Sequence, residues 1–156
     1  MTKYGFLEVP IRSGRSRKMY KKIMVAIDDS ETAQDALEKA ENIAHSYNAA
    51  LCIVHAVNSE DIADKQAGAD LLKRAESSVN ALSIETRLLQ AEDEFGLTGT
   101  GTATSDSIAA AVNEWGADLL VVGTANRRGL ERFVVGSVAE QLVAKVEASI
   151  LLVRPK

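Results

Sequence analysis

The pair Gly136-Ser137 ends a polar, glycine-containing run that starts at Gly123, and an apolar helical pattern follows it directly. The first N–H groups of a helix have no partner within the helix, and with the positive end of the helix dipole they attract anions. Gly136 has no side chain to hold a phosphate away from the backbone, and the Ser137 hydroxyl can donate a hydrogen bond to one. A turn glycine followed by an N-cap serine explains the same pair equally well.

Other polar residues follow apolar runs in the same way. They are Asp28-Asp29-Ser30 after residues 23–27, and Asn58-Ser59 after residues 51–57. Ligands of open parallel sheets bind at the carboxyl ends of the strands, so these segments are the places to expect further ligand contacts.

The remaining reactive side chains have simpler interpretations. Arg127, Arg128 and Arg132 could clamp an anion, but a solvated loop is favoured. Cys52 lies in an aliphatic run and reads as a small core residue, and His55 in the same run reads as structural. Neither metal-ligand spacing nor a Walker A lysine motif is present in the sequence, so we predict no catalytic residue and no metal site.

The elements that must position these residues alternate between strands and helices. The strong strand candidates are aliphatic and do not alternate, which is typical of a sheet covered on both faces. The predicted strands are 23–27, 51–57, 97–103 (the weakest), 118–122 and 149–153. The predicted helices with one apolar stripe are 31–47, with Ser30 as N-cap, 105–115 and 137–147.

The segment from 58 to 96 is the ambiguous part of the chain. Residues 58–67 are polar and read as a loop. Leu72, Ala75, Val79, Leu82 and Leu89 have helical spacing, which favours one long helix over 68–95 that stops at Gly96. Residues 84–89 also fit an alternating strand, and this alternative stays open.

Composition agrees with an α/β domain. The chain has 156 residues, 46% of them hydrophobic but only 4% aromatic, so its core is built from Ala, Val, Leu and Ile. Strands that alternate with helices predict right-handed crossovers. We therefore expect one open five-stranded parallel sheet with helices on both faces, a Rossmann-like α/β fold.

Charge is distributed unevenly along the chain. Residues 1–22 carry seven Lys or Arg and one Glu, while the chain as a whole has a net charge of −4. We expect residues 1–19 to be a basic, flexible tail and 20–156 to be the domain. The acidic domain argues against a nucleic-acid-binding surface. No signal peptide and no apolar run of membrane-spanning length is evident, so we expect a cytoplasmic protein without a membrane partner.

From Tyr20 to Pro155 the chain resembles the universal stress protein family. The opening signature is Ile23-Met-Val-Ala-Ile-Asp-Asp-Ser30, and the closing run Ile150-Leu-Leu-Val-Arg-Pro155 also fits. The family's ATP-binding signature is glycine, two residues, glycine, nine residues, then glycine with Ser or Thr. Gly123, Gly136 and Ser137 match it, but Asn126 stands where the second glycine is expected. Asparagine tolerates left-handed backbone conformations, so the turn can persist.

The resemblance implies an adenine-nucleotide site, with ATP as ligand and Mg²⁺ as its possible companion. Asp28 is then the polar contact to the base, and Asn126 lies among the residues around the phosphates. The implied site residues are Ala26, Ile27, Asp28, Ala56, Val122, Gly123, Asn126, Gly136, Ser137, Val138 and Ala139. The resemblance also implies a homodimer that pairs through the last strand, residues 149–153.

Three functions fit these expectations. The first is an ATP-binding regulator or adaptor in the stress response, and the motif favours it. The second is a slow ATPase, although phosphoryl transfer needs a positioned base that the sequence does not supply. The third is a nucleotide-free homodimeric interaction module, to which Asn126 lends weight.

Overall fold

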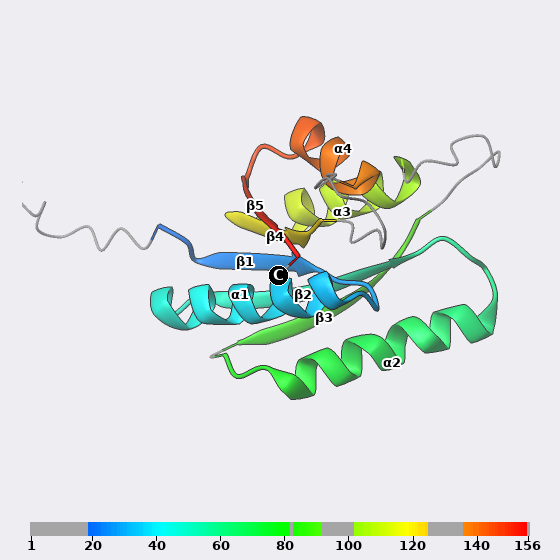
Figure 1. Ribbon diagram of the computed structural model, residues 1–156, viewed down its shortest axis with the longest axis horizontal. Helices are drawn as coiled ribbons and strands as arrows, with labels where there is room; N and C mark the ends of the chain where they lie inside the picture. Colours follow the sequence, from blue (N-terminus) through cyan, green and yellow to red (C-terminus); the bar gives the residue numbers. More distant parts are fainter. Residues whose placement is uncertain (1–18, 82, 92–101, 125–135, 156) are drawn as a thin grey trace, which may run out of the picture.

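The computed structural model describes residues 19–81, 83–91, 102–124 and 136–155 (Figure 1). Five parallel strands form one sheet in the order β3-β2-β1-β4-β5. The strands are β1 (Lys22–Ala26), β2 (Ala50–Val57), β3 (Ile84–Gln90), β4 (Leu119–Gly123) and β5 (Ser149–Val153). The helices are α1 (Glu31–Tyr47), α2 (Ile62–Ser78), α3 (Thr102–Trp115) and α4 (Ser137–Lys145). The expected tail, residues 1–19, lies outside the described residues except for Met19.

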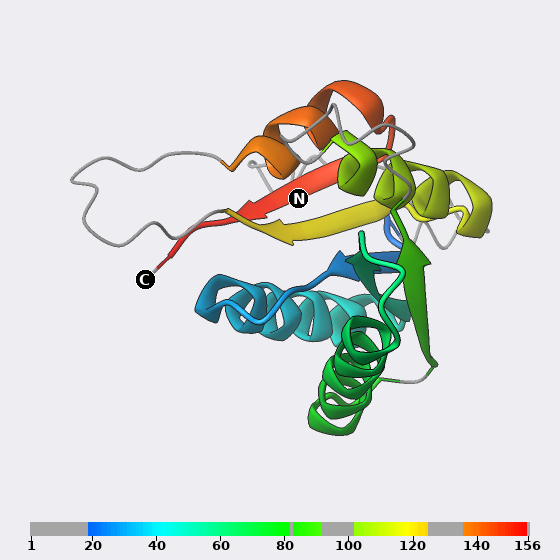
Figure 2. The same ribbon diagram turned by 90° about the vertical axis from the view of Figure 1, so that its right-hand side faces the viewer.

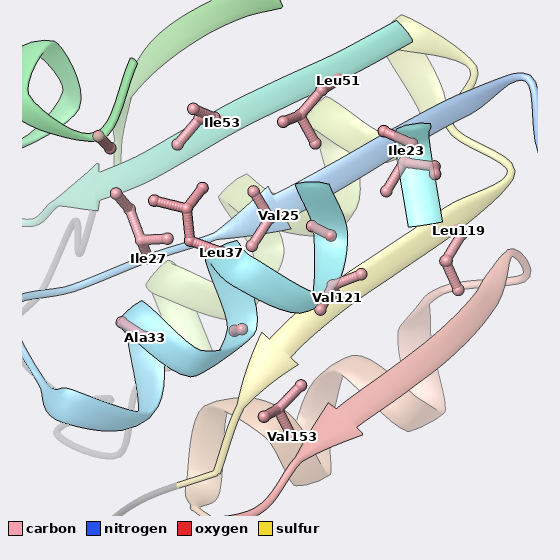
Figure 3. Close-up of a cluster of buried hydrophobic side chains, with 14 of the residues drawn as sticks. Ile23, Val25, Ile27, Ala33, Leu37, Leu51, Ile53, Leu119, Val121 and Val153 are labelled. Atoms are coloured by element: carbon pink, nitrogen blue, oxygen red, sulfur yellow. The ribbon is translucent and has the colours of Figure 1, made fainter. Parts of the chain in front are cut away.

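Successive side chains of the central strands are buried on opposite faces of the sheet. Ile23 and Val25 of β1 pack with α1 and α2 in one cluster, whereas Met24 packs with α3 and α4 in another. Figure 3 shows the first cluster, where side chains from β1, β2, β4 and β5 point to the face that α1 covers. Two buried faces explain why these strands read as unbroken aliphatic runs.

The helices divide between the two faces as the sequence predicts. Figure 2 shows α1 and α2 on one side of the sheet and α3 and α4 on the other. The chain builds β1, β2 and β3 outward in one direction, returns through α3, and adds β4 and β5 on the other side of β1. The predicted fold class is therefore confirmed. The direction of building reverses between β1 and β4, which creates a crevice at the carboxyl ends of these strands.

The predicted helix 31–47 with Ser30 as its N-cap is also confirmed. The Ser30 hydroxyl accepts the Ala33 N–H at 3.2 Å and caps α1. The C-cap that follows the helix is Asn48, whose φ of 52° is left-handed, a conformation that asparagine tolerates. Its buried stripe is rich in alanine, which lets the helix axis lie close to the sheet: Ala33, Ala36, Leu37, Ala40 and Ala44.

The assignment of residues 58–103 is wrong in three places. The predicted loop 58–67 contains the start of α2 at Ile62, capped by the Asp61 carboxylate, which accepts the Ala63 N–H at 2.9 Å. The predicted helix 68–95 ends at Ser78, and β3 replaces its second half. The predicted strand 97–103 is not the third strand, because Thr102 already begins α3; residues 92–101, with Gly96, lie outside the described part of the chain.

The error has a physical cause. β3 is an edge strand whose exposed residues are Glu85, Leu88 and Gln90, and Glu85 Oε2 forms an ion pair with Arg87 Nε at 2.6 Å. Charged edge strands are common because they discourage pairing with other chains. The first turn of α2 has no apolar stripe because it is solvated, with the Ile62 side chain 83% exposed. The sequence pattern therefore marks neither the start of α2 nor the change from α2 to β3.

Within the described residues, none of the helices combines the length and the apolar character that crossing a bilayer requires.

Candidate functional site

A pocket of about 380 Å³ opens at the carboxyl ends of β1, β2 and β4, beside the first turns of α3 and α4. Its volume lies in the range of about 300–1,000 Å³ that is usual for small-molecule sites. All the residues predicted for the nucleotide site, except Asn126, line it: Ala26, Ile27, Asp28, Ala56, Val122, Gly123, Gly136, Ser137, Val138 and Ala139. Asn126 and the three arginines of the same loop lie outside the described residues.

The β1 end of the pocket is a turn held by its own side chains. The Asp28 Oδ1 atom accepts the Ser30 N–H at 2.8 Å, and Ser30 in turn caps α1. This turn fixes the exposed Asp28 carboxylate in the pocket lining, where Oδ2 is the oxygen that the turn does not use. Asp29 is also exposed, but it does not line the pocket.

Gly123 at the end of β4 packs against the backbone of α1 without room for a side chain. A Cβ atom at this position would lie 2.9 Å from the carbonyl oxygen of Thr32 in the first turn of α1. Real Cβ atoms do not approach an oxygen so closely, so glycine lets α1 lie directly against the strand end. The first glycine of the signature thus sets the distance between α1 and β4 at the pocket floor.

The start of α4 has the glycine N-cap without a side chain that the anion-site hypothesis requires. Gly136 is the N-cap, with φ −65° and no side-chain hydrogen bond to the helix, and Ser137 is the first helical residue. The alternative in which Ser137 itself is the N-cap is therefore wrong. The first N–H groups of α4 have no side-chain cap, and the exposed Ser137 side chain stands at the pocket wall beside them.

Ser30, which belongs to a segment where ligand contacts were expected, also lines the pocket, whereas sequence reasoning missed the other lining residues: Ala33, His55, Thr104, Ile108 and Thr124. His55 was interpreted as structural, yet it both lines the pocket and contacts the Ile27 carbonyl oxygen through Nδ1 at 2.7 Å. The signal available for His55 was its place near the carboxyl end of a strand next to β1. Thr104 and Ile108 follow once α3 is known to begin at Thr102.

Cys52 is a core residue, as predicted, and lies outside the pocket lining. Its side chain is buried, and burial, reinforced by the nearby Glu85 carboxylate, raises the pKa of the thiol to about 12. A thiol with such a pKa is protonated at neutral pH and is a poor nucleophile. Across the part of the chain that the structure describes, no three His, Cys, Asp or Glu side chains gather in a way that would hold a metal ion.

Known proteins give this fold and site a context. The model of the universal stress protein family matches residues 19–154. A universal stress protein of Methanocaldococcus jannaschii is 26% identical over 168 residues, which cover 97% of this chain and 91% of that protein. A Staphylococcus saprophyticus protein named as a universal stress protein is 31% identical over 150 residues, covering 86% of this chain and 84% of the relative.

Solved structures agree. A universal stress protein in complex with cAMP is 27% identical, with a TM-score of 0.64, and the match covers 86% of this chain and 97% of that one. A universal stress protein from Archaeoglobus fulgidus shares the fold with a TM-score of 0.71 at 23% identity, over 86% of this chain and 98% of its own. Sequence motifs, topology and these matches lead to one conclusion: the chain belongs to the universal stress protein family.

Proposed function

We propose that the pocket binds an adenine nucleotide, with ATP as the main candidate, and that the protein acts as a nucleotide-dependent regulator or adaptor in the stress response. One observation carries this proposal. The crevice where the strand order reverses collects every described residue of the site that the family signature implies, together with the uncapped start of α4. The similar structure that holds cAMP supports the same class of ligand.

The residues divide into a base end and a phosphate end. Ala26, Ile27 and Asp28 would line the base, and Asp28 Oδ2, the oxygen that the turn to Ser30 does not use, would accept a hydrogen bond from an exocyclic amine. Ala56 would pack against the adenine or ribose, and Val122 with Gly123 would form the floor. The residues around the phosphates would be Asn126, Gly136, Ser137, Val138 and Ala139.

The negative charge of the nucleotide phosphates must be neutralised at the phosphate end of the pocket. The described lining contains neither Lys nor Arg, so the described part of the site meets negative charge with the start of α4 and the hydroxyl groups of Ser137 and Thr104. These groups suit one phosphate. A triphosphate carries more charge, which Mg²⁺ bound to the nucleotide would partly neutralise.

We propose binding rather than catalysis. The titratable side chains in the described lining are Asp28 and His55. Asp28 Oδ1 is held by the Ser30 N–H, and His55 Nδ1 is held by the Ile27 carbonyl oxygen. Phosphoryl transfer requires a group that positions the attacking water or accepts its proton. A slow ATPase remains the alternative, and phosphate release above the rate without protein would establish it.

Calorimetry tests the proposal directly. ATP with Mg²⁺, AMP and cAMP are each titrated into the full chain, and at least one should bind. Ser137→Ala should weaken binding by about 5- to 20-fold, because one hydrogen bond to a charged group is lost. Ser46→Ala is the matched control, since this exposed serine lies in the last turn of α1, outside the pocket lining, where its hydroxyl donates to the Asn42 carbonyl oxygen at 3.0 Å. Absence of both heat and a thermal shift at millimolar nucleotide would favour the nucleotide-free module instead.

We further propose that β5 pairs with β5 of a second copy to form a homodimer. β5 is an edge strand, and Ile150, Leu151 and Leu152 are only partly buried within one chain. An aliphatic edge strand needs a cover, and a twofold interface provides one. The domain that carries both the site and this edge is residues 20–156, and we expect residues 1–19 to contribute to neither.

A further inference from the structure

The His55 imidazole bridges β2 to the backbone of the segment that carries Asp28. Nδ1 lies 2.7 Å from the Ile27 carbonyl oxygen. A carbonyl oxygen only accepts hydrogen bonds, so Nδ1 carries the proton in this contact. The bond therefore fixes one tautomer of the neutral ring and ties the Ile27 carbonyl to β2.

This contact stands where β1 leaves the sheet. The paired register of β1 and β2 ends at Ala26 and Val54, and the last backbone bond between them runs from the Ile27 N–H to the Val54 carbonyl oxygen at 2.9 Å. β2 continues to Val57 in pairing with β3. Both backbone polar groups of Ile27 are thus held, the N–H by the Val54 carbonyl oxygen and the C=O by the His55 imidazole.

Packing holds the ring in place from the other edge. α2 approaches the ring with Gly68, where an added Cβ would lie only 3.1 Å from His55 Cδ2. Gly68 is buried, and Val57 and Leu88 crowd the same position. The imidazole is therefore confined between α2 and the Ile27 carbonyl.

We infer that His55 is a positioning residue for base recognition: it sets the place of the Asp28 carboxylate by anchoring the peptide directly before it. Asp28 is the next residue after Ile27, and its side chain closes the turn to Ser30 at 2.8 Å. The anchor of Ile27 and the turn at Asp28 together leave Oδ2 in one place. Recognition of the adenine amine by Oδ2 rests on the proposed function above, whereas the anchoring itself does not.

The first experiment needs no ligand. Amide hydrogen exchange at Ser30 is compared in the full-length wild type, His55→Leu and His55→Asn. Leucine fills a similar space without a donor, whereas the asparagine side-chain amide has its N–H near the position of Nδ1. We expect Ser30 exchange to speed up by about 10-fold or more in His55→Leu and to stay within about threefold of wild type in His55→Asn. His55→Val, a strand-forming residue without a donor, replaces leucine if that variant does not fold.

The second experiment measures base discrimination. ATP and ITP, like AMP and IMP, differ at one edge of the base: adenine has an amine at position 6 and an unprotonated N1, whereas hypoxanthine has a carbonyl at position 6 and a proton on N1. A carboxylate fixed opposite position 6 accepts a hydrogen bond from the amine and is repelled by the carbonyl oxygen, so wild type should prefer the adenine nucleotide by about 10-fold or more. His55→Leu should reduce this ratio to below about threefold, and His55→Asn should retain it. A purely structural role would lower both affinities together and leave the ratio unchanged.

The outcomes separate the two proposals. Ser30 exchange in His55→Leu that equals wild type, or exchange in His55→Asn that is as fast as in His55→Leu, overturns the anchoring role. Unchanged discrimination in His55→Leu overturns the link to base recognition. If wild type binds none of the four nucleotides, the proposed function fails, and the exchange experiment still decides whether His55 anchors the turn.

Discussion

Gly136 has φ −65°, so its backbone does not require glycine, and what it contributes to the start of α4 is the absence of a side chain. Most residues adopt this φ, and serine or aspartate would cap the helix more strongly. A side-chain cap, however, would occupy the N–H groups that the proposed phosphate needs. Glycine at this position therefore stabilises α4 less than a capping residue would, but it leaves the N–H groups at the helix start open to the proposed phosphate.

The same argument gives a prediction for Asn126, whose fit to the phosphates is known only from its place in the sequence motif. We expect Asn126→Gly to tighten ATP binding by about threefold or more, about 0.6 kcal/mol, because removal of the side chain lets the phosphates approach the backbone. Calorimetry measures the change. Asn126→Ala, which keeps the Cβ but removes the amide, separates steric relief from loss of a hydrogen bond. Equal or weaker affinity in Asn126→Gly would show that asparagine is no obstacle.

At the scale of elements, α1 lies directly against the end of β4 at the pocket floor. Thr32 in the first turn of α1 is buried, and its carbonyl oxygen faces Gly123 at the end of β4. The alanine stripe of α1 continues this close approach along the sheet. The shape of the pocket thus depends on two elements with small side chains where they touch, and a larger group there must displace a helix.

We expect Gly123→Ala to lower the free energy of unfolding by about 1–3 kcal/mol, because the added Cβ meets backbone that cannot move aside without shifting α1. Urea unfolding without nucleotide measures the effect. Gly116→Asn is the control: its φ of 76° suits asparagine, and an added Cβ there has no neighbour within 4 Å. This control should stay within about 0.5 kcal/mol of wild type. A Gly123→Ala midpoint equal to that of wild type would contradict the steric argument.

The sheet formed by the described residues has two edge strands with different characters. β3 carries the Glu85–Arg87 ion pair beside the 40% exposed Leu88, whereas β5 carries three consecutive aliphatic residues, Ile150, Leu151 and Leu152. Charge on an edge strand discourages pairing with another chain, and an aliphatic edge favours it. The asymmetry points to β5 as the edge that a second copy covers.

Sedimentation equilibrium tests this assembly. Wild type should have the mass of a dimer at micromolar concentration, and Ile150→Lys should weaken the dimer by about 10-fold or more, because two like charges would face each other across the twofold axis. Ile62→Lys, at an 83% exposed position at the start of α2, is the control and should remain dimeric. Circular dichroism checks that both variants are folded. A monomeric wild type would refute the proposal.

The sequence by itself determined the central strands, the first helix and most of the residues that line the pocket. β1, β2, β4 and β5 were predictable because strands buried on both faces are continuous aliphatic runs, and Ser30 marked the start of α1. The motif glycines then located the pocket, since the carboxyl ends of the strands on either side of the strand-order reversal must lie together.

Only the tertiary structure decided the identity of β3 and the place of His55. Residues 84–89 fit both a helix and a strand, and the choice is made by pairing with β2, where Leu51 lies opposite Ile84. His55 could not be assigned to the pocket because its role depends on the point at which β1 leaves β2 and on the approach of Gly68. Both depend on contacts between segments that are distant in the chain, and such contacts cannot be predicted from local periodicity.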